Sequence, residues 1–349
     1  MNSSSIARLA RAAALAAIAS LLPGCYLMQA AGGQLAVMSK RRPIERVIAD
    51  PGTPASVRSQ LALVASIRRF ASQELHLPDN GSYRQYADLK RPYVVWNVVA
   101  APEFSVEPRQ WCFPVAGCVA YRGYFRESGA VRFAASLQAH GLDVSVAGVP
   151  AYSTLGHFDD PILNSMLGWS EAQLAAIVFH ELTHQLIYVK GDSDFNEALA
   201  TVVEQEGVMR WLRAAGRGRE LDDWRSWQER AARVNVLLQG ARADLQRLYE
   251  LRLAPGEMRR RKAERFAQLQ EEYRGLSAAW GREAPFRAFF AQALNNAHLA
   301  SVSTYQRCVP GMERLLHETG GDLPRFYERV RALAGMPAGQ RDRESCGGA

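Results

Sequence analysis

The chain has 349 residues, of which 48% are hydrophobic and 22% are charged, so it can build a sizeable core in one large domain or two small ones. Its formal net charge is +7, but the basic residues form no long block, and no aromatic-basic recognition motif accompanies them. We therefore do not expect a nucleic-acid partner.

The N-terminal segment has the pattern of a secretory signal peptide. Arg8 and Arg11 precede an apolar, alanine-rich run over 12–22, which is shorter than a membrane-spanning helix requires. We expect residues 1–24 to be this signal peptide, and residues 25–349 to form a single unit.

The letters "LLPGC", which end at Cys25, resemble a bacterial lipobox, although Pro23 is unusual before Gly24. The resemblance implies cleavage before Cys25 and lipid on its thiol and amine, and so a membrane anchor. Tyr26, in place of Asp, implies the outer membrane of a bacterial cell envelope, facing the periplasm. The alternatives are a plain signal peptide that is cut nearby, or an uncleaved anchor.

The next stretch predicts one helix and then a β-rich part over about 90–150. Thr53 as N-cap, followed by Pro54, predicts a helix that runs to about residue 76. Three runs predict strands, because they are rich in β-branched residues or alternate between apolar and polar residues. They are 93–101, 118–125 and 142–149. A short helix is expected to end at His140, between the second and third strands.

Four cysteines remain after the leader, which suits an oxidising compartment and structural disulfides. They are Cys112, Cys118, Cys308 and Cys346. Cys112 and Cys118 could close a short loop, and Cys308 and Cys346 could form the other pair. Spacing alone leaves this connectivity open.

Helical periodicity begins after this β-rich part. Ser170 and Gln173 have the spacing of a capping box, which predicts a helix over about 171–189. A second helix is expected to begin near Asp194 and to end around Gly216.

Two long helices are expected next, at 220–253 and 257–280, with a break at Ala254-Pro255-Gly256 that favours an antiparallel hairpin. Shorter helices are expected over 284–334. The polar, glycine-rich tail after Gly335 is expected to be ordered only near Cys346, if at all.

The expected fold is therefore α+β and mainly helical. A small sheet over about 90–150 precedes two site helices over about 170–216, and the helical hairpin and C-terminal helices occupy about 218–335.

The segment "FHELTH" carries the strongest chemical pattern. His180 and His184 are four residues apart, so on a helix they share one face and can reach one metal ion. Glu181 lies beside the first His and can approach a metal-bound water without being a ligand. This HExxH arrangement is typical of two zinc ligands and a general base.

A zinc site of this kind needs a third protein ligand. Glu197, in "NEALA", lies thirteen residues after His184, a gap that suits a short turn and a second helix packed against the first. Glu204 lies twenty residues after His184 and is the rival ligand. We favour Glu197 because of its sequence context, and Glu204 is the candidate to orient one of the two His rings instead.

The segments "HELTH" and "FNEALA" together resemble the gluzincin metallopeptidases, in which a Glu of an Asn-Glu-x-x-Ala-like segment is the third zinc ligand. The chain resembles more closely a family of predicted bacterial aminopeptidases, often predicted lipoproteins. The supporting segments are spread over nearly the whole mature chain: "CYLMQAAGGQL", "PAYSTLGHFDDPIL", "FHELTHQLIYVKGDSDFNEALATVVEQEG" and "NNAHLASVSTYQRCVP". The short step to Glu197, and Thr201 where thermolysin-like enzymes often carry an acidic residue, depart from the gluzincin pattern.

The resemblance implies a role for each candidate residue. Glu181 would act as general base, and Tyr305, or in second place Tyr152, would donate a hydrogen bond to the oxyanion. Asp159 or Asp160 would bind the substrate's α-ammonium group.

The sequence thus predicts a zinc-dependent metallopeptidase, with an aminopeptidase favoured, that acts on peptide or protein substrates at the membrane. An envelope endopeptidase is one alternative, and a non-enzymatic zinc-binding lipoprotein scaffold is the other. Glu181 argues against the scaffold, because a purely structural zinc would need no base.

Overall fold

The computed structural model describes residues 26–113, 117–151, 153–154, 156–281, 284–302 and 308–346. The fold is mostly helical with small sheets, as expected for a mainly helical α+β chain. Within the described ranges, no helix combines the length and the apolar composition that crossing a membrane requires.

The described chain opens with mostly short helices. It forms a helix over 26–38, β1 (Arg41–Pro43), α2 (Ile44–Ala49) and α3 (Ala55–Gln73). Pro54 is the N-cap of α3 and no side chain caps this helix, so the predicted Thr53 cap is wrong. The guanidinium of Arg68, buried on α3, donates hydrogen bonds to the carbonyls of Pro78 and Ser82, and thereby fixes the loop that follows the helix.

The strands are short. They are β2 (Gln85–Ala87), β3 (Val95–Pro102), β4 (Trp111–Phe113), β5 (Gly117–Val119), β6 (Arg122–Tyr124), β7 (Leu142–Val149) and β8 (Ile162–Leu163). β3 lies between β6 and β7 and is antiparallel to both, and β7 has the bounds that the sequence predicts. The helix α4 (Glu127–Gln138) packs on this sheet, where its buried alanines meet Trp96 and Val98.

The predicted strand at 118–125 is wrong as a single element. The chain there forms β5 and β6, which pair with different partners, β4 and β3. The reason is the disulfide between Cys112 and Cys118, which face each other in the β4–β5 hairpin. A third sheet, which no pattern in the sequence predicts, has β2 between antiparallel β1 and parallel β8.

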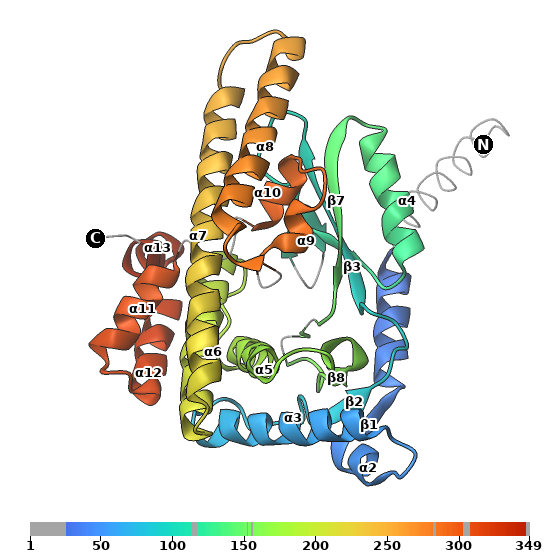
Figure 1. Ribbon diagram of the computed structural model, residues 1–349, viewed down its shortest axis with the longest axis vertical. Coiled ribbons are helices and arrows are strands. Elements are labelled where there is room, and N and C mark those ends of the chain that lie inside the picture. The colour runs from blue at the N-terminus through green and yellow to red at the C-terminus, as the bar shows by residue number, and fades with distance from the viewer. Residues whose placement is uncertain are drawn as a thin grey trace, which may run out of the picture.

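Two helices form the centre of the molecule, α5 (Glu171–Leu186) and α6 (Ser193–Ala214). The predicted capping box is present, because Ser170 and Gln173 bond each other's backbone N–H. Figure 1 shows α5 above α3, with α6 next to it and partly covered by α7. The main hydrophobic core joins α3, α5 and α6, with Phe179 and Phe195 fully buried.

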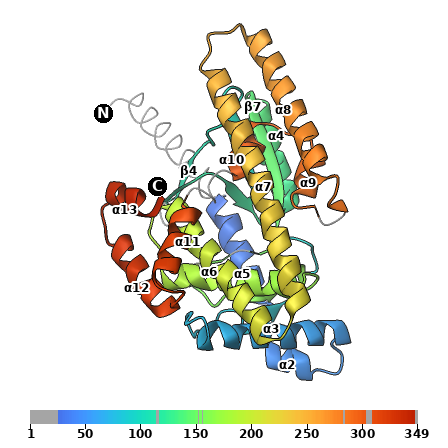
Figure 2. The same ribbon diagram turned by 60° about the vertical axis from the view of Figure 1, so that its left-hand side comes forward.

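The predicted helical hairpin is present as α7 (Gly218–Tyr249) and α8 (Pro255–Ser277). Figure 2 shows its tip extending away from the central helices. A separate hydrophobic cluster, which includes Leu245, Leu269 and Phe290, joins the hairpin to α9 (Arg287–Phe290) and α10 (Asn296–Val302). A short 3-10 helix, η1 (Asn164–Met166), precedes α5.

Three C-terminal helices lie on the outer side of α6 and α7 (Figures 1 and 2). They are α11 (Val309–Glu318), α12 (Leu323–Ala334) and α13 (Ala338–Cys346). The tail after Gly335, expected to be ordered only near Cys346 if at all, is helical from Ala338 to Cys346. The disulfide between Cys308 and Cys346 and the buried Arg341 hold α13 in place. The sequence of α13 is only weakly amphipathic, so it does not predict a packed helix.

Candidate metal centre

α6 approaches α5 closely because Gly207 carries no side chain at their contact. A Cβ at Gly207 would lie only 2.7 Å from side-chain atoms of Phe179 and Leu75. Phe179 directly precedes the first His of the HExxH segment. Close packing at Gly207 therefore brings the residues of α6 within reach of that His.

The connection between α5 and α6 is fixed by Asn196, which is buried. Its side-chain oxygen accepts a hydrogen bond from the N–H of Val189, and its amide donates to the carbonyl of the same residue, each at 2.8 Å. Asp192 caps α6 by accepting from the N–H of Phe195, and it also accepts from Arg341 at 2.7 Å. Asn196, the residue before Glu197, thus fixes the short connection between α5 and α6.

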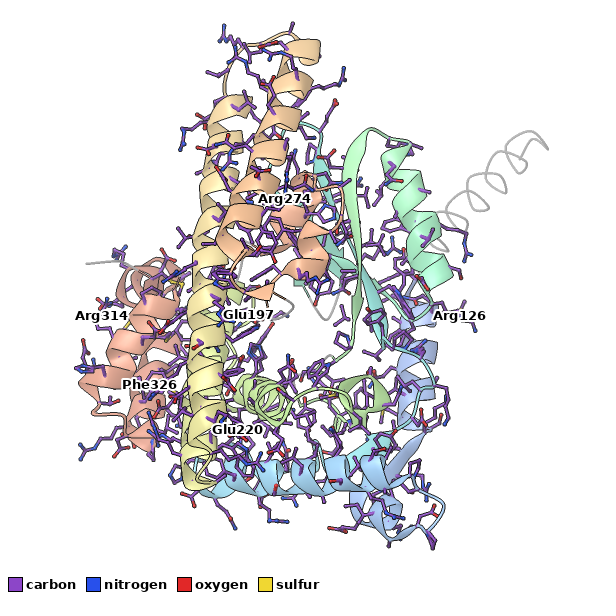
Figure 3. The ribbon with its side chains drawn as sticks, viewed as in Figure 1. Arg126, Glu197, Glu220, Arg274, Arg314 and Phe326 are labelled. Atoms are coloured by element: carbon purple, nitrogen blue, oxygen red, sulfur yellow. A yellow bond between two sulfur atoms is a disulfide. The ribbon has the colours of Figure 1, made fainter. Side chains whose placement is uncertain are left out.

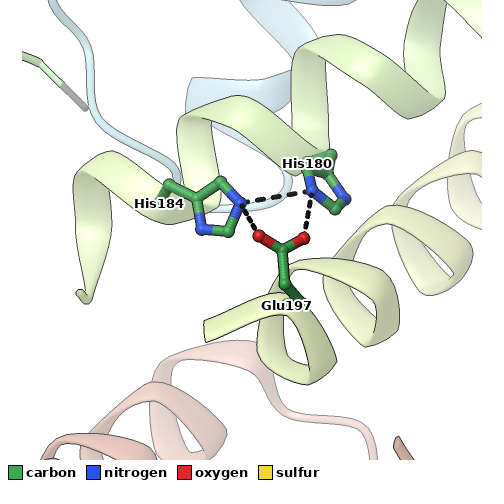
Figure 4. Close-up of side chains that lie close together, drawn as sticks. All are labelled: His180, His184 and Glu197. Carbon is green, nitrogen blue, oxygen red and sulfur yellow. Dashed lines mark hydrogen bonds and ion pairs between the residues drawn. The ribbon is translucent and has the colours of Figure 1, made fainter. Parts of the chain in front are cut away.

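His180, His184 and Glu197 converge on one point between the two helices (Figure 4). The Nε2 atoms of the two rings are 3.2 Å apart. Oε2 of Glu197 lies 3.3 Å from Nε2 of His180, and its Oε1 lies 3.7 Å from Nε2 of His184. These three residues form a group that can hold a metal ion.

The separations themselves test whether a metal ion fits. Three donors at about 2.0–2.1 Å from a tetrahedral ion would lie roughly 3.3 Å from one another. The observed separations of 3.2, 3.3 and 3.7 Å are close to this value. Two imidazole nitrogens and a carboxylate are also a donor set common in catalytic zinc sites. The residues therefore fit a metal ion.

Glu204 lies on the other side of the His180 ring. Its Oε2 is 3.0 Å from Nδ1, so the carboxylate accepts the hydrogen bond that this nitrogen can donate. Burial acts to lower the pKa of His180, but the hydrogen bonds with Glu197 and Glu204 outweigh it and hold this pKa well above its usual value. The metal-free chain therefore keeps His180 protonated between two carboxylates.

His184 has a different environment. Burial and the positive charge of His180 lower the pKa of His184 to about 4, so this ring is neutral at physiological pH. Its Nδ1 is buried and has no hydrogen-bond partner within the described structure. Its ring meets the edge of Tyr188, at 6.3 Å between centroids.

Glu181 follows His180 on α5 and has a hydrogen bond with Ser153 of the loop before η1. Burial, together with the charges of Glu197 and Asp160, raises the pKa of Glu181 to about 7, against the effects of His180 and of a hydrogen bond from Ser153. A carboxylate with a pKa near 7 can both accept and return a proton at neutral pH. Glu181 thus has the chemistry that a general base requires.

Asp160, by contrast, is fully engaged within the protein. It is buried, and it accepts hydrogen bonds from the N–H and hydroxyl of Thr154, at 2.8 and 2.9 Å, and from Ser153 at 3.2 Å. Its carboxylate therefore shapes the loop that reaches Glu181. Asp159, next to it, is exposed.

The chain matches a family model described as "Putative aminopeptidase" over residues 25–344. It belongs to this aminopeptidase family. The match covers nearly the whole chain and supports peptidase activity. Neither the search of curated proteins nor the search of solved structures gave a match.

Three of the sequence-derived site residues of this aminopeptidase-family chain, Tyr305, Tyr152 and Cys25, lie outside the described residues. Two other tyrosines, missed by sequence reasoning, border the metal centre. The pKa of Tyr121 is raised by burial and then by the charge of Glu197, and the pKa of Tyr188 is raised in the same order.

Both side chains are partly exposed, at 44% for Tyr121 and 47% for Tyr188. Tyr188 lies four residues after His184, just beyond the end of α5 at Leu186, and could have been found from that spacing. Tyr121 comes from the turn between β5 and β6, and no local pattern connects it to the metal centre.

Proposed function

We propose that this chain is a zinc-dependent metallopeptidase that acts as an aminopeptidase. The observation that carries the proposal is the convergence of His180, His184 and Glu197 at separations of 3.2, 3.3 and 3.7 Å. Family membership supplies the reaction class, since the matching family is described as an aminopeptidase.

Zinc is the metal that this set of donors favours. Two imidazoles and one carboxylate leave a fourth position open, as in hydrolytic zinc sites. The four cysteines at 112, 118, 308 and 346 are held in disulfides, so they are not available as thiolate ligands. When bound, zinc would polarise the scissile carbonyl and lower the pKa of water at the site.

The protein's own groups would handle the proton and the developing charge. Glu181 accepts a proton from the attacking water and later delivers it to the leaving amine, a role that its pKa of about 7 supports. Glu204 holds the His180 ring in place through Nδ1. Tyr305 would donate a hydrogen bond to the oxyanion, and Tyr121 is the alternative that the structure adds.

An aminopeptidase must also bind the substrate's free α-ammonium group. Of the two candidates, Asp159 is the better one, because its side chain is exposed whereas the carboxylate of Asp160 already accepts internal hydrogen bonds. A ligand for the ammonium group is what would separate this activity from that of an endopeptidase.

We place the enzyme in the bacterial envelope, attached to the outer membrane by lipid on Cys25 and facing the periplasm. The lipobox-like segment supports the anchor. Disulfides between Cys112 and Cys118, and between Cys308 and Cys346, support an oxidising compartment. Mass spectrometry of the membrane-extracted protein should find an acylated N-terminal Cys25, and an unmodified N-terminus elsewhere would contradict this placement.

The proposal is tested by peptide pairs that differ only in acetylation of the amino terminus. The metal-loaded protein should cleave the free peptides and spare the acetylated ones, and a chelator should abolish the cleavage. Equal cleavage of both would favour an endopeptidase. Chelator-resistant cleavage, or none across a broad panel, would contradict a zinc peptidase.

A further inference from the structure

A cavity of about 620 Å³ lies between the helix over 26–38 and the segment that leads from β6 into α4. Most of its wall is apolar and comes from residues such as Met28, Val37 and Phe125. Figure 3 labels Arg126 at this cavity, on the opposite side of the sheets from Glu197 of the metal centre. The cavity is therefore separate from the candidate metal centre.

The charged part of the wall is entirely basic. Its four charged residues are Lys40, Arg91, Arg126 and Arg132. Arg91 is engaged within the fold, where it donates to the carbonyls of Phe125 and Val94.

The other three basic side chains are exposed, and within the described ranges they form no ion pair with a carboxylate. Asp88, which adjoins the cavity wall, pairs with Lys90 at 2.7 Å. An anion that enters the cavity would thus meet three cations and no carboxylate on its wall.

The helix over 26–38 also presents apolar side chains to the outside. Met28 is 70% exposed, Leu35 is 66% exposed and Leu27 is 45% exposed. Met28 and Leu35 are seven residues apart, so they lie on one face of the helix. A helix with an exposed apolar face next to Lys and Arg side chains is suited to the interface of an anionic bilayer.

We propose that this cavity binds one anionic phospholipid of the membrane surface. Its phosphate would lie among Lys40, Arg126 and Arg132, and its acyl chains would extend along the apolar face that carries Met28 and Leu35. Charge complementarity selects an anionic headgroup, and the apolar wall selects a lipid over a free anion. The site requires neither the proposed peptidase activity nor lipid on Cys25.

Such a site would orient the protein on the membrane as well as retain it there. An anchor at one residue allows the protein to rotate about its attachment point, whereas a bound lipid beside the first helix would fix one face toward the bilayer. The cavity and the metal centre are apart, so occupation of the cavity should leave hydrolysis of short soluble peptides unchanged.

The test measures binding of short-chain phospholipids to the full-length protein by native mass spectrometry. Dioctanoyl-phosphatidylglycerol should bind with one molecule per chain, and at least tenfold more tightly than dioctanoyl-phosphatidylcholine. Two variants should each weaken this binding at least tenfold. Arg126→Glu reverses one wall charge, and Gly32→Glu places a carboxylate in the cavity, where a new Cβ would meet no atom within 4 Å.

Arg314→Glu is the matched control, because it makes the same charge change on the exposed face of α11, on the far side of the molecule (Figure 3). It should bind lipid as the wild type does. Equal binding of the two lipids, or equal binding by Arg126→Glu, Gly32→Glu and Arg314→Glu, would overturn the proposal. Full displacement of the lipid by millimolar inorganic phosphate would also overturn it, by showing a site for a free anion.

Discussion

The carboxylate of Glu204 lies 3.0 Å from Nδ1 of His180, on the side of the ring opposite to the Nε2 atom that faces His184 and Glu197. One imidazole thus joins two glutamates of α6 that are two helical turns apart. This geometry supports different tasks for the two glutamates in the proposed site, with Glu197 as the ligand and Glu204 as the group that orients His180.

Glu197→Ala should lose most of the bound metal, because it removes one of three ligands. Glu204→Gln should retain one metal per chain but bind it about 10–100-fold more weakly, as is typical when the partner of a ligating His is changed. Glu206→Gln is the control, since Glu206 is on the same helix but pairs with Arg210. Metal content and competition with a chelator measure all three. Full metal in Glu197→Ala with none in Glu204→Gln would reverse the assignment.

Metal binding should release about one proton from the metal-free protein at neutral pH. The hydrogen bonds of Glu197 and Glu204 raise the pKa of His180 against burial, so this ring is protonated until a metal displaces the proton. His184, with a pKa lowered to about 4, should release none.

The affinity for the metal should therefore fall as the pH falls, by about tenfold per pH unit while His180 stays protonated in the metal-free state. Calorimetric titration with zinc, in buffers of different ionisation enthalpy, counts the proton. A heat of binding that does not depend on the buffer would refute the protonated His180.

Asn196→Ala should destabilise the fold and weaken metal binding together. The change leaves the N–H of Val189 without its side-chain partner, at a cost of about 1–3 kcal/mol, whereas the carbonyl of Val189 keeps its hydrogen bond from the N–H of Asp192. Ser193→Ala, at the exposed start of the same helix, should change the free energy of unfolding by less than about 0.5 kcal/mol. Denaturant titration gives both values, and equal losses would show that the connection does not depend on Asn196.

If Tyr305 supplies the oxyanion donor, Tyr305→Phe should lower kcat about 10²–10³-fold with little change in KM. Tyr121→Phe should then have an effect close to that of Tyr188→Phe, the comparison variant at the other border of the metal centre. A large fall in kcat for Tyr121→Phe with normal turnover in Tyr305→Phe would transfer the role to Tyr121.

The parts of the fold that the sequence predicts are those with strong local signals. The capping box at Ser170 and Gln173 marks the start of α5, and β-branched alternation marks β7. The disulfides join the cysteines that were named as possible pairs, although spacing alone left the connectivity open. Local chemistry is enough for the cap, the alternation and the short Cys112–Cys118 loop, because these depend on neighbours in the chain.

Other features depend on contacts between distant segments. β2 is three residues long and β8 is two. They are stabilised by pairing with each other, so no local sequence pattern predicts them. α13 depends on the disulfide at Cys346 and on the contact of Arg341 with Asp192. Tyr121 lies in the turn between β5 and β6, far from His180 and Glu197 in the sequence, so no local pattern links it to the metal centre.

The most direct test of the central claim is the rate of peptide hydrolysis by Glu181→Gln, measured on protein whose zinc content and unfolding are determined in the same preparation. Glu181 adjoins His180 but is not one of the three side chains that converge on the candidate metal position, so the variant should keep about one zinc per chain and the wild-type unfolding profile. Loss of the general base should lower kcat by about 10²–10⁴-fold. Hydrolysis at the wild-type rate by zinc-loaded Glu181→Gln would contradict the account.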